Sequence, residues 1–493
     1  MTPATPPDLV DRERERAALE SLLQRPGASI ALVTGRRRVG KTFLLTKALP
    51  ADTTFFFTAT RTTPEQNRRQ LIRDLTAWSG AALHEEDYPT WRAVFDLLWR
   101  TREGTPFAVV LDEFQYLASD DDGLADVASA LNATFERRTT TRPLTVALSG
   151  SAVATLDGLA TGGAPLYGRL ALHLRLEPLA AFDVATFVAD WNPRDRVAGY
   201  GVFGGTPAFW ALVDPTVDLR TNIAALALAR EGRVRLQLET LLAQEEGLGD
   251  VAAYQGVVRA VAGGATTRAR IADATGLKHD HALVRRLETL VRLGHLAEDP
   301  AVEAPTNAPV RYRVADPALR FHHAFVTPNA SMLERSDPLA VYDELIAPRL
   351  DTFLGPAFER LVAPTYERLR SDRSLPLIRT WGRWEGHDRE RRPIEVDVVA
   401  DLADGRVLSG AVKWNRKPIS AAVLFDHLDA VRRAAHAGRR WAHAAQGGPL
   451  LFLAAGGYDP GFLAAASAHS APVWAWTLDE VYAAPTDDTA ERR

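Results

Sequence analysis

The sequence predicts an α/β protein built around a parallel sheet with crossover helices. Short apolar segments alternate with longer amphipathic segments in the first third of the chain, as strands and helices of such a sheet do. The alternation returns toward the C-terminus, which indicates a second α/β region. In the first region we expect strands at 29–34, 55–57, 107–111 and 144–148, and helices at 11–23, 64–78, 89–101 and 123–138.

The length of 493 residues predicts several domains rather than one. Strand patterns fade after Arg175, and helical patterns follow until the second α/β region begins. We expect a core at 8–178, a helical lid at 179–250, a winged helix-turn-helix at 251–325, a linker with short helices at 326–350 and a C-terminal domain at 351–484. The C-terminal domain should contain a helix, three strands, a helix, a strand, a helix and a strand.

The composition excludes several classes of protein. The net charge of −4 excludes a chain that is basic throughout, so any contact with DNA must come from a local basic face. The chain has no cysteine, which excludes disulfides and thiolate metal sites. No apolar run reaches the ~18 residues that a membrane span needs, and the N-terminus lacks the pattern of a signal peptide. We therefore expect a cytoplasmic protein that does not bind membranes.

The most specific motif is a phosphate-binding loop, which matches the pattern G-x-x-x-x-G-K-[ST]. Glycines let the backbone N–H groups face a phosphate, the lysine reaches the β- and γ-phosphates, and the last hydroxyl binds Mg²⁺. An apolar strand precedes the loop and an amphipathic helix follows it, so a chance glycine-rich turn is disfavoured. The sequence therefore predicts an ATP site. Its loop residues are Gly35, Arg36, Arg37, Arg38, Val39, Gly40, Lys41 and Thr42.

Two carboxylates end the next strongly apolar strand, in the segment FAVVLDE. Ligands of parallel sheets bind at the carboxyl ends of the strands, so these acids should meet the loop. We expect Asp112 to hold Mg²⁺ together with Thr42, and Glu113 to polarise the attacking water as a general base. A pair of acids that merely caps a helix is the alternative, but it does not explain why a phosphate-binding loop precedes them.

Two further side chains are candidates for contact with the phosphates. Ser151, in Ser149-Gly150-Ser151 after the next strand, would orient the water or sense the γ-phosphate, or else cap a helix. Arg169, in Leu-Tyr-Gly-Arg, would place a guanidinium on the phosphates of its own chain or of a neighbouring one. A structural ion pair is the alternative for Arg169.

Residues 267–296 fit a helix-turn-helix. Ile271 and Ala274 should face a core, and Leu283, Leu287, Leu290 and Val291 form a helical stripe that Gly294 ends. A strand pair near 296–314 would form the wing. Double-stranded DNA is the predicted partner, because the second helix presents basic side chains. The basic residues for this contact are Lys278, Arg285 and Arg286. The alternative is that the winged helix docks on its own chain or on a protein partner.

Several segments together resemble the largely archaeal family of prokaryotic ATPases in the AAA+/STAND group. They are Asp11-Arg12-Glu13, GRRRVGKT, VVLDEFQYL, LSGS, LYGR, the Gly-Gly-Thr-Pro turn at 204–207 and YRVADPALRF at 312–321. The resemblance covers about 12–420. It implies that Arg12 and Pro207 line the adenine pocket, and that ATP closes the lid on the core so that hydrolysis acts as a switch. A homo-oligomer is compatible with this family.

The family's C-terminal region is similar to PD-(D/E)XK nucleases, in which two carboxylates bind Mg²⁺ and a lysine orients the water. The matching positions are Glu359, Asp397 and Lys413, but Ala411 stands where the second metal carboxylate belongs. Glu395 lies two residues before Asp397 on the same strand face and is a candidate substitute. We expect a degenerate restriction-endonuclease-like domain that does not cleave DNA; the alternative is a hairpin with solvated charges.

The sequence leaves three functions open. The first is an ATP-controlled switch that acts on DNA or on a DNA-associated partner. The second is an ATP-regulated, Mg²⁺-dependent nuclease, against which Ala411 counts. The third is a signalling ATPase whose winged helix binds protein rather than DNA.

Overall fold

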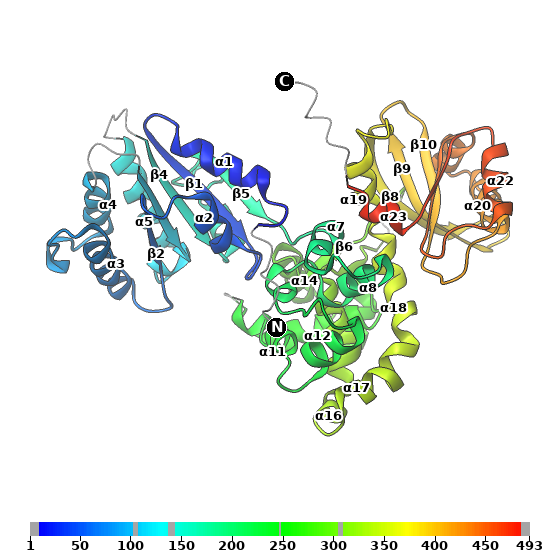
Figure 1. The fold of residues 1–493 in the computed structure, drawn as a ribbon, viewed down its shortest axis with the longest axis horizontal. Coiled ribbons are helices and arrows are strands. Elements are labelled where there is room, and N and C mark those ends of the chain that lie inside the picture. The colour runs from blue at the N-terminus through cyan, green and yellow to red at the C-terminus, as the bar shows by residue number, and fades with distance from the viewer. Residues whose placement is uncertain (1–8, 102–106, 137–142, 246–247, 304–308, 485–493) are drawn as a thin grey trace.

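The computed structural model describes residues 9–101, 107–136, 143–245, 248–303 and 309–484. Two α/β lobes lie on either side of a helical region (Figure 1). The blue and cyan lobe holds the N-terminal sheet, and the yellow to red lobe holds the C-terminal sheet. Some predicted regions extend beyond the described residues. Residues 8, 102–106 and 137–142 belong to the predicted core, and 137–138 also to its predicted helix at 123–138. Residues 246–247 belong to the predicted lid and 304–308 to the predicted wing. Within the described ranges, no helix has both the length and the apolar character needed to cross a bilayer.

The N-terminal sheet has five parallel strands in the order β2-β3-β4-β1-β5. They are β1 (Ala28–Gly35), β2 (Thr54–Thr58), β3 (Phe107–Asp112), β4 (Leu144–Gly150) and β5 (Leu170–Leu176). The four expected strands are confirmed, but β5 was not predicted. It lies at the sheet edge and is only partly buried, so polar residues such as His173 and Arg175 interrupt its apolar pattern.

Helices cover both faces of this sheet. They are α1 (Glu13–Leu23), α2 (Lys41–Ala48), α3 (Pro64–Ser79), α4 (Trp91–Arg100), α5 (Asp121–Glu136) and α6 (Val153–Gly158), with short 3-10 turns η1 (Glu85–Asp87) and η2 (Phe114–Leu117). Leu19 of α1 and Leu44 of α2 pack on one face, and α3, α4 and α5 pack on the other. The bounds of α3 follow from its ends, since Thr63 accepts a hydrogen bond from the Gln66 N–H and Gly80 is left-handed.

The strand register brings the predicted site residues to one edge of the sheet. Thr34 of β1 is level with Gly150 of β4, and Leu111 of β3 is level with Leu148. All strands run the same way, so β1, β3 and β4 end together. The chain segments that follow these three strands therefore meet at this edge.

The helical region is one packed body with a continuous hydrophobic core that extends from Leu179 to Leu354. Its first part, the predicted lid, consists of α7 (Ala181–Val184), η3 (Ala185–Val188), α8 (Pro193–Phe203), α9 (Pro207–Trp210), α10 (Leu219–Asn222), the π-helical turn η4 (Ile223–Leu228), α11 (Arg233–Glu239) and η5 (Leu242–Gln244). Trp210 is among the largest fully buried side chains of this core.

The winged helix follows the lid and contains α12 (Val251–Ala262), α13 (Arg268–Thr275), α14 (His281–Arg292) and the antiparallel strands β6 (Leu296–Glu298) and β7 (Tyr312–Val314). The helix-turn-helix geometry agrees with the expectation: Ile271 is buried, Gly276 is left-handed at the turn, and Gly294 is left-handed after α14. One detail was wrong. Ala274 is exposed, because Ala272 occupies the buried position beside Ile271.

The segment 326–350, predicted as a linker with short helices, contains such helices and is packed into the core. This part of the chain consists of short helices whose apolar side chains, such as Leu333, Val341 and Ile346, belong to the same core as the lid and the winged helix. Helices of four or five residues are too short to show a periodic apolar stripe. The elements are α15 (Pro317–Phe321), η6 (His322–Val326), η7 (Thr327–Asn329), α16 (Ala330–Leu333), α17 (Pro338–Val341) and η8 (Tyr342–Ile346).

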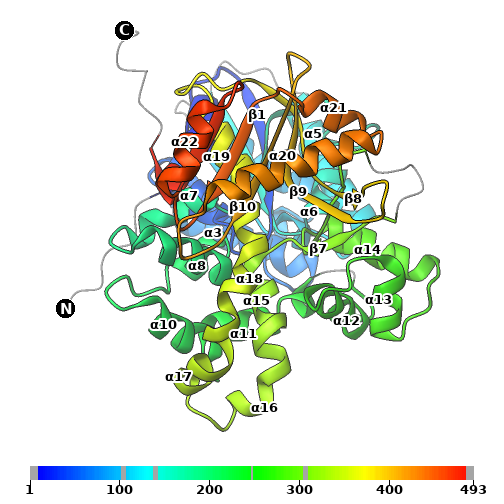
Figure 2. The ribbon, with the colours of Figure 1, turned by 90° about the vertical axis from the view of Figure 1, so that its right-hand side faces the viewer.

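The C-terminal lobe is a mixed sheet in the order β12-β11-β10-β9-β8. Its strands are β8 (Ile378–His387), β9 (Pro393–Leu402), β10 (Val407–Lys413), β11 (Leu450–Ala454) and β12 (Val473–Trp476). Strands β8, β9 and β10 pair antiparallel, whereas β10, β11 and β12 pair parallel. Three consecutive strands followed by two single strands, with helices between them, match the order predicted along the chain; the pairing was not predicted. Its helices are α18 (Ala347–Glu359), α19 (Val362–Leu369), α20 (Ala421–His436), α21 (Arg440–Ala445), α22 (Pro460–Ala468) and α23 (Leu478–Tyr482). Helix α18 rises from the helical region to this sheet (Figure 2).

Candidate nucleotide-binding site

The phosphate-binding loop connects β1 directly to α2. Both of its glycines are needed for this turn. Gly35 has a φ of 154°, and a Cβ there would lie 2.6 Å from the carbonyl oxygen of Leu176; Gly40 has a φ of 99°. The Lys41 ammonium donates hydrogen bonds to the carbonyl oxygens of Gly35 at 2.8 Å and Arg36 at 3.1 Å. The lysine thus lies within the curl of the loop, which opens toward the N-terminus of α2.

Two acids and a hydroxyl lie beside this lysine. Burial lowers the pKa of Lys41, against the opposing effect of Glu113 and Asp112. The Thr42 hydroxyl donates to the Asp112 carboxylate at 2.7 Å. Both side chains offer oxygen ligands of the kind that Mg²⁺ takes, and they lie within one hydrogen bond of each other, so they fit this ion.

Glu113 is held in a single orientation at the end of β3. Its backbone is left-handed, with a φ of 52°, which is uncommon for a residue other than glycine. Its carboxylate accepts hydrogen bonds from the Ser151 hydroxyl at 3.1 Å and from the Gln115 amide. Ser151 therefore acts on the predicted base rather than as a helix cap. Gln115, which lies two residues after the base, was not predicted as a site residue.

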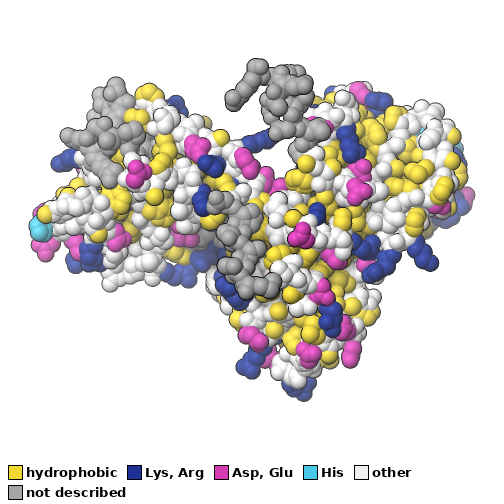
Figure 3. All heavy atoms as spheres, in the orientation of Figure 1, with side chains coloured by type: hydrophobic (Ala, Val, Ile, Leu, Met, Phe, Trp, Pro, Cys, Tyr) yellow, Lys and Arg dark blue, Asp and Glu magenta, His cyan; other side chains and the backbone are white. Residues whose placement is uncertain are grey.

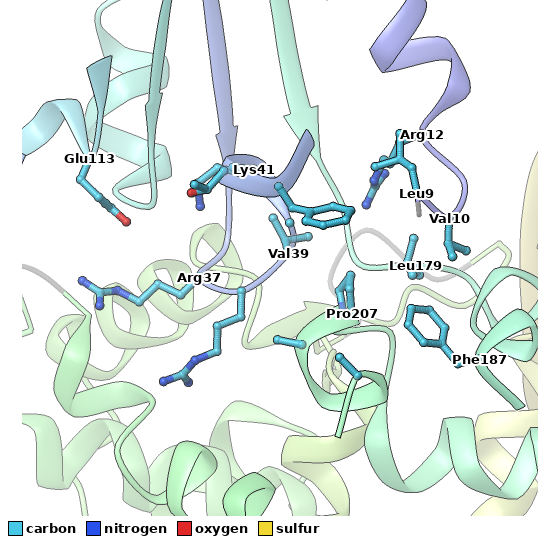
Figure 4. Close-up of a pocket in the computed structure, with 16 residues that line it drawn as sticks. Leu9, Val10, Arg12, Arg37, Val39, Lys41, Glu113, Leu179, Phe187 and Pro207 are labelled. Carbon is cyan, nitrogen blue, oxygen red and sulfur yellow. The ribbon is translucent and has the colours of Figure 1, made fainter. Parts of the chain in front are cut away.

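A cavity of about 520 Å³ extends from the loop to the helical region (Figure 4). Lys41 and Glu113 lie at its polar end. Thr42, which follows Lys41, also lines the cavity. The other end is apolar and is lined by Leu9, Val10, Phe43, Leu179, Phe187, Pro207, Ala208 and Ala211. One polar end and one apolar end suit a ligand with phosphates and a flat base, and the volume is within the usual range of such sites.

The apolar end confirms that the two residues assigned by resemblance lie at the cavity. Pro207 begins α9, and Arg12 precedes α1. The Arg12 guanidinium donates to the carbonyl oxygen of Glu177 and pairs with Glu15 at 3.1 Å, so it ties the N-terminal segment to the end of β5. Most of the apolar lining was missed, because aliphatic residues in a loop carry no sequence signal of their own.

Arg169 lies away from the phosphate-binding loop of its own chain. It immediately precedes β5, and the first residue of that strand, Leu170, is level with Ile30 near the start of β1. Arg169 therefore lies toward the opposite edge of the sheet from Gly35, and it pairs with Glu136 at the end of α5. The prediction that Arg169 contacts phosphate in the same chain is wrong, and the structural ion pair is what the chain forms.

The arginines of the loop contact neighbouring elements. The Arg36 guanidinium lies 3.1 Å from the Asp316 carboxylate, which is almost fully buried and caps α15 by accepting from the Ala318 N–H at 2.8 Å. Arg37 donates to the Tyr116 hydroxyl at 2.9 Å. The loop that faces the nucleotide cavity is thus also bonded to the helices that lead toward the C-terminal lobe.

A smaller cavity of about 300 Å³ lies between the N-terminal core and the winged helix. Arg37 and Ser151 line it from the core, and Glu245 and Arg292 line it from the helical region. The buried His295 contacts Glu245 at 3.2 Å beside this cavity, and burial lowers the pKa of this histidine. The winged helix therefore lies beside Arg37 and Ser151 of the core.

Two of the three residues predicted to contact DNA are exposed on the surface of the winged helix. Lys278 and Arg285 are exposed, whereas Arg286 is partly buried and lies 3.6 Å from Asp250. Lys278 belongs to the turn and not to the second helix, which begins at His281. On the face in Figure 3, basic and acidic side chains intermingle over all lobes, so no single basic face dominates that view.

The C-terminal lobe pairs two of its four candidate residues directly, and the other two, Glu359 and Glu395, lie within electrostatic reach of each other. Asp397 of β9 accepts hydrogen bonds from the Lys413 ammonium at 3.1 Å and from the Val412 N–H at 2.9 Å. Burial, and then the carboxylates of Asp397 and Glu395, raise the pKa of Glu359 to about 7. The Glu395 side chain is 65% exposed and lies 3.7 Å from Arg383. In the described part of the chain, no three acidic, histidine or cysteine side chains are grouped to hold a metal ion.

Ala411 is packed into an apolar cluster with Ile419, Leu424 and Phe452. A carboxylate at this position would be buried against these side chains, which is unfavourable without a metal or hydrogen-bond partner. The site therefore lacks one acid and also lacks polar surroundings for it.

The fold and the cavity together define an ATP-binding P-loop ATPase domain. Residues 9–208 match the family model of an ATPase domain predominantly from Archaea. Residues 322–423 match a model described as archaeal and bacterial proteins of unknown function. The chain thus carries an ATPase domain of this archaeal type, followed by that C-terminal region.

One relative and two solved structures extend the comparison. The chain is 23% identical over 418 residues to the uncharacterized protein MJECL04 of Methanocaldococcus jannaschii, which covers 82% of this chain and 87% of the relative. The Walker-type ATPase PABY2304 of Pyrococcus abyssi is 20% identical, with a TM-score of 0.46 over 64% of this chain and 96% of that one. The ORC2 protein of Aeropyrum pernix, in ADPNP and ADP complexes, is 16% identical, with a TM-score of 0.43 over 67% and 97%.

Proposed function

We propose that this protein is an ATP-hydrolysing switch that acts on DNA or on a DNA-associated partner. The observation that carries the proposal is the ion pair between Arg36 and Asp316. It joins the loop that contacts the phosphates to the helix that follows the winged helix. Any movement of the loop on ATP binding therefore acts on the region that precedes the C-terminal lobe.

Hydrolysis would use the residues at the polar end of the cavity. Glu113 would accept a proton from water as the water oxygen bonds to the γ-phosphorus and the bond to the bridging oxygen breaks. Ser151 and Gln115 hold its carboxylate in place. Thr42 and Asp112 would hold Mg²⁺, which neutralises charge on the phosphates when it is bound.

The switch would work through Lys41 and Arg36. Lys41 donates to the carbonyl oxygens of Gly35 and Arg36, and it must exchange these acceptors for phosphate oxygens when ATP binds. Arg36 thus carries one acceptor of the lysine and also the guanidinium that pairs with Asp316. Loss of the lysine contact would alter the position of Arg36 and hence its ion pair with Asp316, which caps α15.

Contact with DNA is proposed for the exposed residues of the helix-turn-helix. Lys278 and Arg285 are exposed and next to the second helix or on it, where a major-groove contact would form. Such a contact would weaken steeply with salt, because each phosphate that is neutralised releases counterions. Nuclease activity is not part of the proposal, because Asp397 already pairs with Lys413 and Ala411 offers no ligand.

The test is steady-state ATP turnover by wild-type protein and by Glu113→Gln, with and without duplex DNA at low and moderate salt. Turnover that DNA stimulates at low salt and that Glu113→Gln abolishes would support both parts of the proposal. Turnover that ignores DNA would favour a protein-binding switch instead. Wild-type protein that binds ATP and does not turn it over, with or without DNA, would contradict the hydrolytic part.

A further inference from the structure

A second large cavity, of about 800 Å³, lies within the helical region, away from the phosphate-binding loop. The end of α12, the turns η6 and η7, and the start of α18 form its walls. Arg259, Arg320 and Arg349 line it, together with His323, and no aspartate or glutamate does. Arg259 and Arg349 are exposed, so the cavity can be reached from solvent.

Two of these arginines are oriented by aromatic rings. The Arg320 guanidinium lies 4.1 Å from the ring centre of Phe353, and the Arg349 guanidinium lies 5.4 Å from that of Phe325. A guanidinium over a ring is fixed by cation–π attraction, while its N–H edge remains able to donate to an anion. Among the residues that the structure describes, none forms a salt bridge with Arg259, Arg320 or Arg349.

His323 adds no negative charge to this cavity. Burial, and then His322 and Arg259, lower the pKa of His323 to about 3, so the imidazole is neutral near pH 7. Its Nδ1 lies 3.3 Å from the Thr327 hydroxyl. Glu359 acts electrostatically on Arg320, but no acid is among the lining residues, so an anion in the cavity would face three guanidinium groups and no lining carboxylate.

We propose that this cavity binds a phosphate-bearing ligand. Guanidinium groups match the oxygens of phosphate in bidentate geometry, and the buried rings beneath Arg320 and Arg349 hold two of these guanidinium groups in place. The volume is within the range of sites for small molecules of nucleotide size. The same chemistry has two sources, a free phosphorylated molecule or the backbone of DNA.

Occupancy would connect two parts of the chain. Arg259 belongs to the winged helix, whereas Arg349 belongs to α18, the helix that rises to the C-terminal sheet (Figure 2). One phosphate contacted from both sides would tie the winged helix to α18. This site is separate from the ATP cavity, so the proposal does not depend on ATP hydrolysis.

The test uses inorganic pyrophosphate as the probe, with the full chain in a Lys41→Ala background so that the phosphate-binding loop contributes little. Calorimetric titration should detect pyrophosphate binding to this protein. Arg259→Ala and Arg349→Ala should each weaken it about tenfold, because each removes a charged donor. Both side chains are exposed, so their removal should leave the fold intact, which circular dichroism checks. Arg335→Ala, an exposed arginine that does not line the cavity, is the matched control.

A second titration distinguishes the two sources by following a fluorescent DNA duplex. Weakened pyrophosphate binding with unchanged DNA affinity would support a free phosphorylated ligand. Weakened binding of both, with pyrophosphate displacing DNA, would support the DNA backbone. The proposal is overturned if the Lys41→Ala protein binds no pyrophosphate and the arginine variants bind DNA as the control does, or if all variants bind pyrophosphate equally well.

Discussion

The two sheets of this protein use similar residues in different ways. Each places an aspartate on a strand near a lysine, Asp112 with Lys41 in the N-terminal sheet and Asp397 with Lys413 in the C-terminal sheet. In the first, the lysine donates to loop carbonyl oxygens and the aspartate accepts from Thr42. In the second, the lysine and the aspartate pair directly with each other.

This difference decides what each site can bind. The groups around Asp112 have acceptors and donors that a phosphate and a metal ion can replace, and a cavity of about 520 Å³ lies beside them. Asp397 is already satisfied by an ammonium and a backbone N–H. An aspartate near a lysine therefore does not by itself indicate a functional site. A ligand can bind only where it can replace the present hydrogen-bond partners of these two side chains.

The largest expected difference is in ATP turnover when the lysine of each pair is replaced in turn. Lys41→Ala should reduce ATP turnover at least about 100-fold, because the lysine contacts the transferred phosphates. Lys413→Ala should leave turnover unchanged, because Lys413 lies in the other lobe. Steady-state turnover of the two variants, with ATP affinity measured alongside, checks this. Equal losses in both would show that the C-terminal pair supports the ATPase.

The next effect concerns the missing acid. Ala411→Glu should destabilise the C-terminal lobe by about 2 kcal/mol, because it buries a carboxylate in an apolar cluster without a partner. Denaturant unfolding measures the loss, and Ala411→Val is an apolar control of larger size. Plasmid nicking that requires Mg²⁺ and appears only in Ala411→Glu would break the comparison, because the lobe would then be one residue short of a nuclease.

A smaller effect should be visible in the pH dependence of stability. The pKa of Glu359 is about 7 in the folded protein, above its ordinary value of 4.5, because of burial and the nearby Asp397 and Glu395 carboxylates. A raised folded pKa stabilises the protein below the unfolded pKa, and this contribution is lost as pH rises through 7. Between pH 5 and pH 8, the free energy of unfolding of the wild type should therefore fall by about 1–2 kcal/mol more than that of Glu359→Gln.

Thermal unfolding of both proteins across this pH range is the measurement. Glu390→Gln is the control, because its side chain is mostly exposed and it is not among the groups that shift the pKa of Glu359. Parallel profiles for wild type and Glu359→Gln would mean that Glu359 is ionised in the folded protein, as in a site ready for metal.

The smallest expected effect is on the link between the lobes. Arg36→Ala removes the ion pair with Asp316 and should weaken the ATP-dependent protection of the helical region two- to fivefold, or about 0.5–1 kcal/mol. Limited proteolysis with and without ATP measures the protection. Arg69→Ala, which removes a surface pair with Glu65 on α3, is the control. Unchanged protection in Arg36→Ala would refute the coupling through Asp316.

The sequence by itself determined the parts of this protein that depend on local chemistry. The loop from Gly35 to Thr42, the strand that ends in Asp112 and Glu113, and the helix-turn-helix were all predicted, because each rests on a contiguous pattern or on the rule that parallel strands end at one edge. The absence of an acid at position 411 was also evident from one residue.

Only the tertiary structure decided which distant residues meet. Arg169 pairs with Glu136 away from the phosphate-binding loop, and Arg36 pairs with Asp316. Gln115 donates to Glu113, and the segment expected to be a linker, 326–350, packs into the core of the helical region. These outcomes depend on packing between segments far apart in the chain. A single sequence states the chemistry of a side chain but not its neighbours, and the neighbours decide whether that chemistry is used.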